Sequence, residues 1–416
     1  MSNLFTARSA TAALDRPTRP RRALPALCLT QITSWGIVYY AFPVLNSQIT
    51  TATGWSAAMT TAAFSAALLV SALAGIRVGR ILDTRGPRTV MTTGSVIGTA
   101  SLIIIATAPN LALFTAGWLL AGLAMASTFY QPAFAALTRW WAPDHVRALT
   151  VVTLAGGLAS TVFAPLTAQL ADHFSWRHTY LILAAVLAAV TVPAHAFALR
   201  GPWPPAQPSV AAGATATTTV ITRSRPFLLL ATALTLSAFA MYAVVVTLIP
   251  LLLDRGYTPA QAAWALGLGG AGQTLGRTLY AALARRSSPA LRATALIGLG
   301  GATTAAFAFI TGPYLLLAVL AVIAGTVRGN LTLLQATAIT DRWGANRYGR
   351  LSGILAAPTT TASALAPFAG TALAVPLGGY PHLFAVLALA SAAAALIAWH
   401  TTPTDGTTWT APVRRP

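Results

Sequence analysis

The sequence contains no lysine, no glutamate and one cysteine, Cys28, among its 416 residues. A single cysteine excludes an intramolecular disulfide and gives no cysteine-based metal site. Charged residues make up only 8% of the chain, which is too little to cover the surface of a soluble protein of this length. The chain also lacks a hydrolase triad, a phosphate-binding loop and a metal-ligand cluster. We therefore predict that the protein is not an enzyme and uses neither a cofactor nor a metal.

Apolar residues are abundant instead: 56% of the chain is hydrophobic and the mean hydropathy is +0.68. A membrane-spanning helix needs about 20 consecutive apolar residues. On that rule we expect an all-α membrane protein with twelve transmembrane helices, which places both termini on one side of the bilayer. The expected helices cover residues 25–47, 56–78, 89–108, 111–137, 148–171, 179–199, 227–253, 260–284, 291–311, 314–339, 350–374 and 381–400.

The positions of the arginines indicate the orientation. Of the 26 basic residues, Arg177 and Arg255 fall on one side of the predicted helices, Arg277 and Arg328 fall inside helices, and all others fall on the opposite side. Cytoplasmic loops carry such an excess of arginine. We therefore expect both termini to be cytoplasmic and the protein to lie in the cell's inner membrane. The net charge of +19 then faces anionic lipids and implies no nucleic acid.

The two halves of the sequence are related to each other. Residues 53–56 (TGWS) recur as 255–258 (RGYT), and residues 138–148 recur as 341–351, at offsets of about 202. Such a constant offset predicts two six-helix pseudo-repeats. The expected parts are a cytoplasmic tail (1–24), an N-terminal half (25–199), a Pro-, Ala- and Thr-rich cytoplasmic linker (200–226), a C-terminal half (227–400) and a second tail (401–416).

The segment 79–88, GRILDTRGPR, lies between the second and third predicted helices. It resembles the loop signature of the major facilitator superfamily, G-x-x-x-D-R/K-x-G-R-R/K. The matching or nearby residues are Gly79, Asp83, Arg85, Gly86 and Arg88. The resemblance implies a loop that braces the inner gate in the outward-open state. The alternative is a loop whose arginines only fix the topology.

Arg277 and Arg328 lie deep in the eighth and tenth predicted helices. A central arginine costs roughly 2.5–3.5 kcal/mol on insertion scales, so such residues usually face a polar cavity or a partner. The seven aspartates all fall in tails, loops or helix ends. Two unpaired guanidinium groups favour an anionic ligand, and their planar donors fit a carboxylate. Alternatively, Arg277 extends to the cytoplasmic boundary, and Arg328 bonds to backbone carbonyls or to Gln335.

An arginine deep in the eighth helix is similar to the one that holds substrate carboxylate in the monocarboxylate transporter and oxalate:formate exchanger branch of this superfamily. The resemblance implies that role for Arg277. Animal monocarboxylate transporters have an aspartate one turn earlier, where this chain has Gln273. The oxalate exchanger has a second basic residue in the eleventh helix, and Arg328 in the tenth could substitute for it.

Other polar residues are expected to border the same cavity because they lie on helices that line it in the family. They could equally be packing residues or interfacial anchors. The further candidates are Gln31, Trp35, Tyr39, Tyr130, Gln131 and Tyr242.

The favoured function is a monomeric secondary transporter for a small organic anion, a monocarboxylate or dicarboxylate, which works by alternating access between its two halves. No acidic residue is central enough to relay protons. We therefore expect either anion exchange or movement of a proton together with the substrate. A drug or antibiotic exporter of the same superfamily is the alternative. A membrane receptor or scaffold with this fold is a third class.

Overall fold

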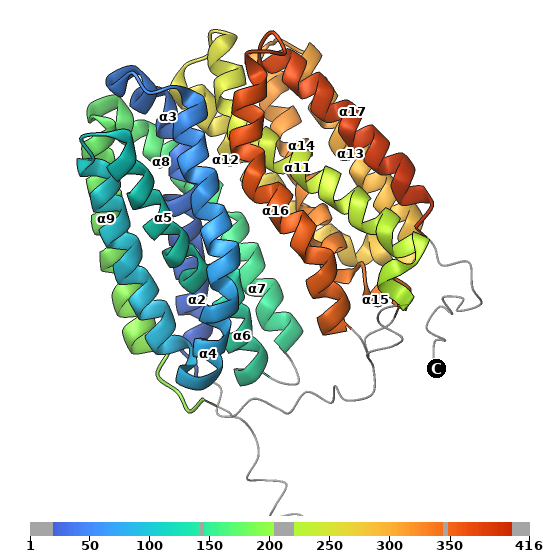
Figure 1. Ribbon diagram of the computed structural model, residues 1–416, viewed down its shortest axis with the longest axis horizontal. Coiled ribbons are helices and arrows are strands. Elements are labelled where there is room, and N and C mark those ends of the chain that lie inside the picture. Colours follow the sequence, from blue (N-terminus) through green and yellow to red (C-terminus); the bar gives the residue numbers. More distant parts are fainter. Residues whose placement is uncertain (1–19, 142–144, 204–219, 344–347, 402–416) are drawn as a thin grey trace, which may run out of the picture.

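The computed structural model describes residues 20–141, 145–203, 220–343 and 348–401, and within these ranges it is helical and contains no β-strand. Figure 1 shows two groups of helices, α2 to α9 and α11 to α17, side by side. Most of the predicted tails (1–24 and 401–416) and of the linker (200–226) lies outside the described residues.

The first predicted helix is divided into three helical segments without a loop between them. They are α2 (Ala23–Ser34), the π-helical segment η1 (Trp35–Tyr40) and α3 (Ala41–Thr53). The other helices of this group are α4 (Ala57–Thr107), α5 (Leu111–Thr128), α6 (Tyr130–Trp140), α7 (His145–Gly157), α8 (Ala159–His173), α9 (Trp176–Pro193) and η2 (Ala194–Ala198).

The segment 79–88 is not the open loop that the sequence suggested. The second and third predicted helices extend into it from either side and meet directly at a kink, and together they carry the label α4. The kink is at Gly86, whose φ of 74° and ψ of 171° are non-helical. Glycine adopts a positive φ without steric cost, and Pro87 then suits the first turn of the next helix.

The second group contains α11 (Arg225–Asp254), α12 (Pro259–Arg286), α13 (Pro289–Phe309), α14 (Tyr314–Thr337), α15 (Thr340–Trp343), α16 (Tyr348–Ala374) and α17 (Tyr380–Trp399). In the described ranges, eight helices are long and apolar enough to cross a membrane, and α4 holds two spans because of its kink. The first span is divided, and α12 and α16 contain many glycine, threonine, alanine and proline residues. These three complete the twelve spans.

The internal repeat is visible in the backbone. Gly54 and Gly256 both adopt a left-handed conformation, with φ of 73° and 82°. Two residues later, Ser56 and Thr258 each accept a hydrogen bond from the backbone N–H three residues farther on, which caps the following helix. The recurring TGWS and RGYT segments therefore encode the same turn and helix start in both halves.

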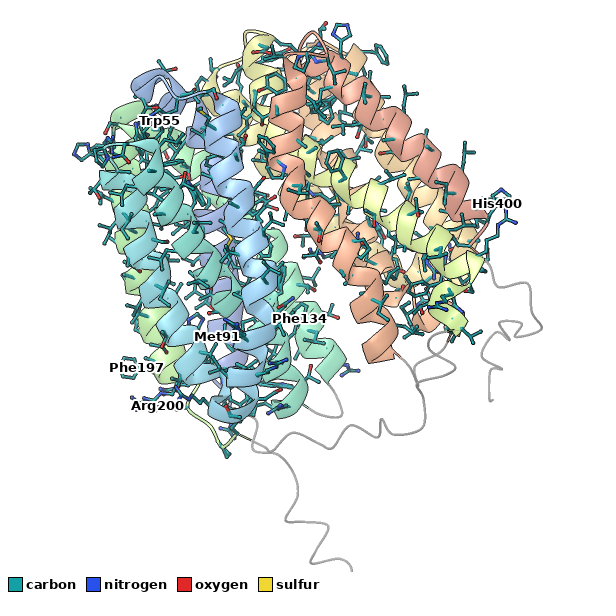
Figure 2. The ribbon with its side chains drawn as sticks, viewed as in Figure 1. Trp55, Met91, Phe134, Phe197, Arg200 and His400 are labelled. Carbon is teal, nitrogen blue, oxygen red and sulfur yellow. The ribbon has the colours of Figure 1, made fainter. Side chains whose placement is uncertain are left out.

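Hydrogen bonds join the two halves. Ser65 Oγ accepts from the backbone N–H of Phe368 at 3.0 Å, and Thr161 Oγ1 donates to the Gly267 carbonyl at 2.8 Å. We call the end of the molecule that Trp55 marks in Figure 2 the arginine-poor end, and the opposite end, where Arg200 lies, the arginine-rich end. In Figure 1 the two groups approach each other at the arginine-poor end and diverge toward the other.

Candidate substrate site

A cavity of about 110 Å³ lies between the halves, and we call it the arginine cavity. Helical segments of both groups supply its wall, so it sits where a movement of one half against the other would change its shape. It is lined by Trp35, Tyr39, Tyr40, Tyr130, Gly156, Met241, Tyr242, Val245, Gln273, Arg277, Arg328 and Thr332. None of these residues is acidic.

Arg277 reaches this cavity from α12 and is only 6% exposed. Its Nη1 donates to the backbone carbonyl of Thr153 on α7, in the other half of the molecule, and its Nε has no partner among the described residues. The side chain therefore crosses between halves instead of extending to the membrane boundary. That position excludes the alternative in which Arg277 only reaches toward the cytoplasm.

Two adjacent glycines on α7 make this approach possible. A Cβ at Gly157 would lie 3.2 Å from Nη1 of Arg277, and a Cβ at Gly156 would overlap the hydroxyl of Tyr130. The break between α7 and α8 follows directly, since α7 ends at Gly157 and α8 begins at Ala159. This glycine pair leaves space for both polar side chains at the cavity wall.

Arg328 reaches the cavity from α14. Its Nη2 lies 3.4 Å from Oε1 of Gln273 on α12, while its Nε is buried without a partner among the described residues. The bond to Gln335 that the sequence offered as an alternative is absent from the described contacts. This long, weak hydrogen bond goes to a neutral amide, and no acidic side chain among the described residues pairs with the Arg328 guanidinium.

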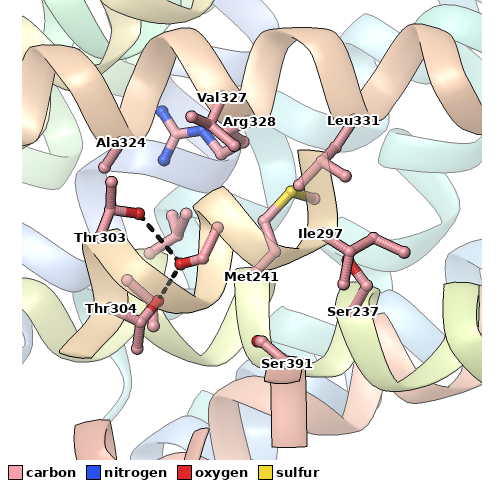
Figure 3. Close-up of a pocket in the computed structure, with 13 residues that line it drawn as sticks. Ser237, Met241, Ile297, Thr303, Thr304, Ala324, Val327, Arg328, Leu331 and Ser391 are labelled. Atoms are coloured by element: carbon pink, nitrogen blue, oxygen red, sulfur yellow. Dashed lines mark hydrogen bonds between the residues drawn. The ribbon is translucent and has the colours of Figure 1, made fainter. Parts of the chain in front are cut away.

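A smaller chamber of about 50 Å³ lies behind Arg328, inside the second half (Figure 3). Thr303 and Thr304 donate their hydroxyl hydrogens to the Gly300 carbonyl at 3.0 and 2.8 Å, so their oxygens remain free to accept. A chamber of this size has room for a water molecule or two. Arg328 thus has a polar environment on both sides.

Aromatic donors face the arginines from the first half. The indole Nε1 of Trp35 and the hydroxyl of Tyr39 line the cavity and are buried without a hydrogen-bond partner among the described residues. With the Nε atoms of Arg277 and Arg328, the wall holds four unpaired donor groups. A buried donor without a partner is costly, so this wall is suited to a ligand that brings several acceptors.

Close packing of α12 on α14 fixes the spacing of the two arginines. Cβ atoms at Gly272 and Gly276 would overlap the carbonyls of Val322 and Thr326, so the backbones touch, as the GxxxG pattern predicts. Gly325 and Gly329 on α14 pack in the same way against α12. Both pairs have the GxxxG spacing, which is the signal in the sequence for such close helix packing.

A second cavity, of about 280 Å³, adjoins the first and shares Trp35, Tyr39, Tyr130 and Tyr242 with it. We call it the neighbouring cavity. Gln131 lies on its wall, as expected for a cavity residue. Its remaining lining residues are Leu68, Ser71, Ala72, Met125, Ala126, Phe129, Thr360, Ser363 and Ala364.

Gln31 does not line either cavity, which corrects the expectation from the sequence. It is fully buried, and its Nε2 donates to the Thr128 carbonyl at 2.7 Å. In a regular helix that carbonyl would accept the backbone N–H of residue 132, but Pro132 has none. Gln31 replaces the missing donor and thereby fixes the first span against the break between α5 and α6.

The segment 79–88 makes its described contacts within the first half. Asp83 pairs with Arg139 at the end of α6, and not with Arg85 or Arg88. Arg88 donates to the Ala196 carbonyl at 2.9 Å, Arg85 is exposed, and space is open around Gly79.

Trp203, just beyond η2, covers this segment. Its Nε1 donates to the backbone carbonyl of Asp83 at 3.0 Å, its ring lies 4.4 Å from the Arg139 guanidinium, and it would touch a Cβ at Gly86.

These features define a class: a multi-pass helical membrane protein whose repeated halves enclose a polar central cavity, which is the construction of a transporter. The model of the Major Facilitator Superfamily matches residues 27–326 and 254–415. The chain belongs to this superfamily of membrane transporters.

Named relatives agree with this assignment. The chain is 31% identical over 205 residues to monocarboxylate transporter 13 of Bos taurus, covering 49% of this chain and 47% of the relative. It is 33% identical over 207 residues to monocarboxylate transporter 11 of Homo sapiens, covering 48% and 42%. The chain thus covers about half the length of the curated relatives it matches.

Among solved structures, a crystal structure of a mutant of the nucleoside transporter NupG superposes with a TM-score of 0.75. The match covers 90% of this chain and 98% of that chain at 14% sequence identity. An identity this low indicates a shared fold and nothing about the substrate.

Proposed function

We propose that this protein is a secondary transporter of a small organic anion, in which Arg277 and Arg328 bind a carboxylate group. The observation that carries the proposal is the set of four unpaired donor groups on the wall of a cavity without acidic lining residues. A carboxylate has two oxygens that accept several hydrogen bonds and can accept bidentate bonds from arginine.

The electrostatics favour an anion over a cation or a neutral ligand. Both guanidinium groups can donate hydrogen bonds but accept none. A cation would be repelled by them, and a neutral ligand would leave two charges uncompensated in a medium of low dielectric constant. The monocarboxylate transporters among the relatives support the same class of ligand.

The position of Arg277 also suggests how binding could be coupled to movement. Its bond to Thr153 connects α12 to α7 across the two halves. A carboxylate that takes over this donor would weaken the connection and free the halves to rock about the cavity, as alternating access requires. The protein would lie in the inner membrane of the cell, and its arginine-rich end would face the cytoplasm.

The test is counterflow in proteoliposomes with labelled monocarboxylates and dicarboxylates, comparing the unmodified protein with Arg277→Ala. We expect accumulation by the first and at least a hundredfold loss in the variant, because one charged hydrogen-bonded pair contributes roughly 3 kcal/mol. The matched control is Arg286→Gln, which removes a charge from an exposed position on the same helix. Equal activity of Arg277→Ala and Arg286→Gln would refute the proposal. So would drug efflux by this protein without any carboxylate flux.

A further inference from the structure

We infer that the substrate is an amphipathic carboxylate whose apolar or aromatic body fills the neighbouring cavity while its carboxylate lies in the arginine cavity. This inference rests on the proposed function and adds the shape and polarity of the ligand. Two-carbon and three-carbon acids would then be poor substrates. The argument comes from the sizes of the cavities, their linings and the rings that separate them.

The arginine cavity is small for a complete substrate site. Its volume is about 110 Å³, whereas small-molecule sites generally have roughly 300–1,000 Å³. The neighbouring cavity, at about 280 Å³, is more than twice as large. Only the two cavities together reach the usual range. A ligand confined to the first would leave most of the accessible space empty.

The linings of the two cavities differ in chemistry. The arginine cavity has both guanidinium groups and Gln273. The neighbouring cavity has no charged lining residue, and its wall carries the side chains of Leu68, Met125 and Phe129. Burying apolar surface there is favourable, and a flexible methionine adapts to different shapes. Its amide and hydroxyl groups, such as Gln131 and Ser363, tolerate an uncharged polar substituent.

The four shared aromatic residues lie at the boundary between the two cavities, since they line both. Trp35 stacks on Phe129 with ring centroids 4.1 Å apart, and it also lies 5.5 Å from Tyr39 and 5.3 Å from Tyr130. Flat rings of this kind offer apolar faces to a ligand and polar edges to its head group. One molecule can therefore contact the unpaired Trp35 and Tyr39 donors with its carboxylate end and the ring faces with its body.

The experiment measures the affinity of the purified protein for acetate, butyrate, hexanoate and 3-phenylpropionate at neutral pH, where all four are anions. Each buried methylene should raise the affinity about fourfold. The uncharged alcohol 3-phenylpropanol should bind at least a hundredfold more weakly than 3-phenylpropionate.

Two variants fill the neighbouring cavity from opposite halves: Ala72→Leu on α4 and Thr360→Leu on α16, with Ala72→Ser as the matched control. We expect the leucine variants to lose at least tenfold in affinity for 3-phenylpropionate and to keep their affinity for acetate. Retained acetate binding shows that the variants fold. Partition of long acids into detergent affects all variants equally and cancels in the comparison.

The possible failures are distinguishable. If no acid of any length binds, or if the alcohol binds as well as the acid, the proposed function fails and this inference fails with it. If all acids bind equally, or if the leucine variants keep full affinity for 3-phenylpropionate, the inference is overturned while anion transport survives. If the leucine variants lose acetate as well, the two cavities do not hold separate parts of the ligand, and the inference is again overturned.

Discussion

An ion pair ties together helix ends at the arginine-rich side of each half, but the two halves place the acidic residue on opposite partners. In the first half, Asp83 near the kink of α4 pairs with Arg139 at the end of α6. In the second half, Arg292 near the start of α13 pairs with Asp341 on α15. The internal repeat aligns Arg139 with Arg342, and Asp341 with the residue before Arg139. Both halves therefore have an ion pair at this place, which we call the brace, but the acidic and the basic residue have exchanged positions.

The environments of the two pairs differ as well. The side chains of Arg139 and Asp83 are 18% and 54% exposed, whereas those of Arg292 and Asp341 are 3% and 25% exposed. Arg342 takes another role: it donates to Thr401 Oγ1 at 2.9 Å, and desolvation by burial lowers its pKa to about 10. An exposed pair suits a contact that breaks and reforms, and a buried pair suits a fixed joint.

Asp341→Asn should have the largest effect on stability. It leaves Arg292 as a buried cation without its counterion, at a cost of about 1–3 kcal/mol. We expect a lower thermal midpoint in detergent and a smaller fraction of folded protein. The exchanged double variant Arg292→Asp with Asp341→Arg should restore part of the loss, because it rebuilds the pair with the polarity of the first half. A midpoint unchanged in Asp341→Asn would show that this pair does not hold the second half together.

Gln273→Asp tests why both halves keep their acids at helix ends and away from the cavity. The new carboxylate would lie close to Arg328 and compete with the substrate for it. We expect about tenfold weaker binding of a carboxylate at neutral pH, because the nearby guanidinium groups favour the ionised form of the introduced carboxyl and it then competes with the substrate for them.

The unmodified protein should show little pH dependence of binding between pH 5 and 8. The lining residues of the arginine cavity include no carboxyl or imidazole side chain, and these are the groups that ordinarily change charge in or near this range. Gln273→Asn, which stays neutral, is the matched control and should remain equally flat. Equal affinities of Gln273→Asp and Gln273→Asn for a carboxylate would show that residue 273 does not face the bound anion.

Asp83→Asn should have a smaller effect on stability, below about 1 kcal/mol, because the Asp83 side chain is 54% exposed and water replaces part of the lost interaction. If the pair breaks and reforms during transport, the variant should lower turnover several-fold more than it lowers substrate affinity. Initial rates over a range of substrate concentrations separate the two. Should Asp83→Asn and Asp341→Asn destabilise the protein equally, the contrast between a movable and a fixed brace would be lost.

Sequence reasoning located the helices and the two cavity arginines because their signals are local: long apolar runs, and arginines inside them. It was harder to predict which polar side chains of one helix reach the cavity. Gln31 and Trp35 are four residues apart and share a helix face. Trp35 lines the cavity, whereas the Gln31 amide donates its hydrogen bond to the Thr128 carbonyl instead. That difference depends on Pro132 in another helix.

The pairing of Arg292 with Asp341 was not predicted either, because the two residues are 49 positions apart and only the packing of α15 near α13 brings them together. The short loop between α12 and α13, which corresponds to segment 79–88 in the second half, contains no acidic residue. The acid is present but lies in a different segment. Pair partners at helix ends depend on tertiary packing, which the spacing of residues within one loop does not contain.

Trp203→Ala should have the smallest effect, and it acts on the first half. Trp203 covers the kink of α4 while its ring contacts Arg139, and such a cation–π contact at an exposed site contributes about 0.5–1 kcal/mol. Removing it should release the Asp83 brace and change the ratio of the two access states by about two- to fivefold.

The change can be followed by the spin-label distance between Thr51→Cys and Val375→Cys, exposed positions at the arginine-poor end of opposite halves, in a Cys28→Ser background. We expect a larger share of long distances in Trp203→Ala than in the matched control Trp203→Phe, which keeps an aromatic ring over Arg139. If Trp203→Phe changes the distances as much as Trp203→Ala, the hydrogen bond to the Asp83 carbonyl is the contact that matters. Unchanged distances in both variants would mean that the Asp83–Arg139 pair does not respond to the loss of Trp203. The proposal that this pair breaks and reforms during transport would then have to be abandoned.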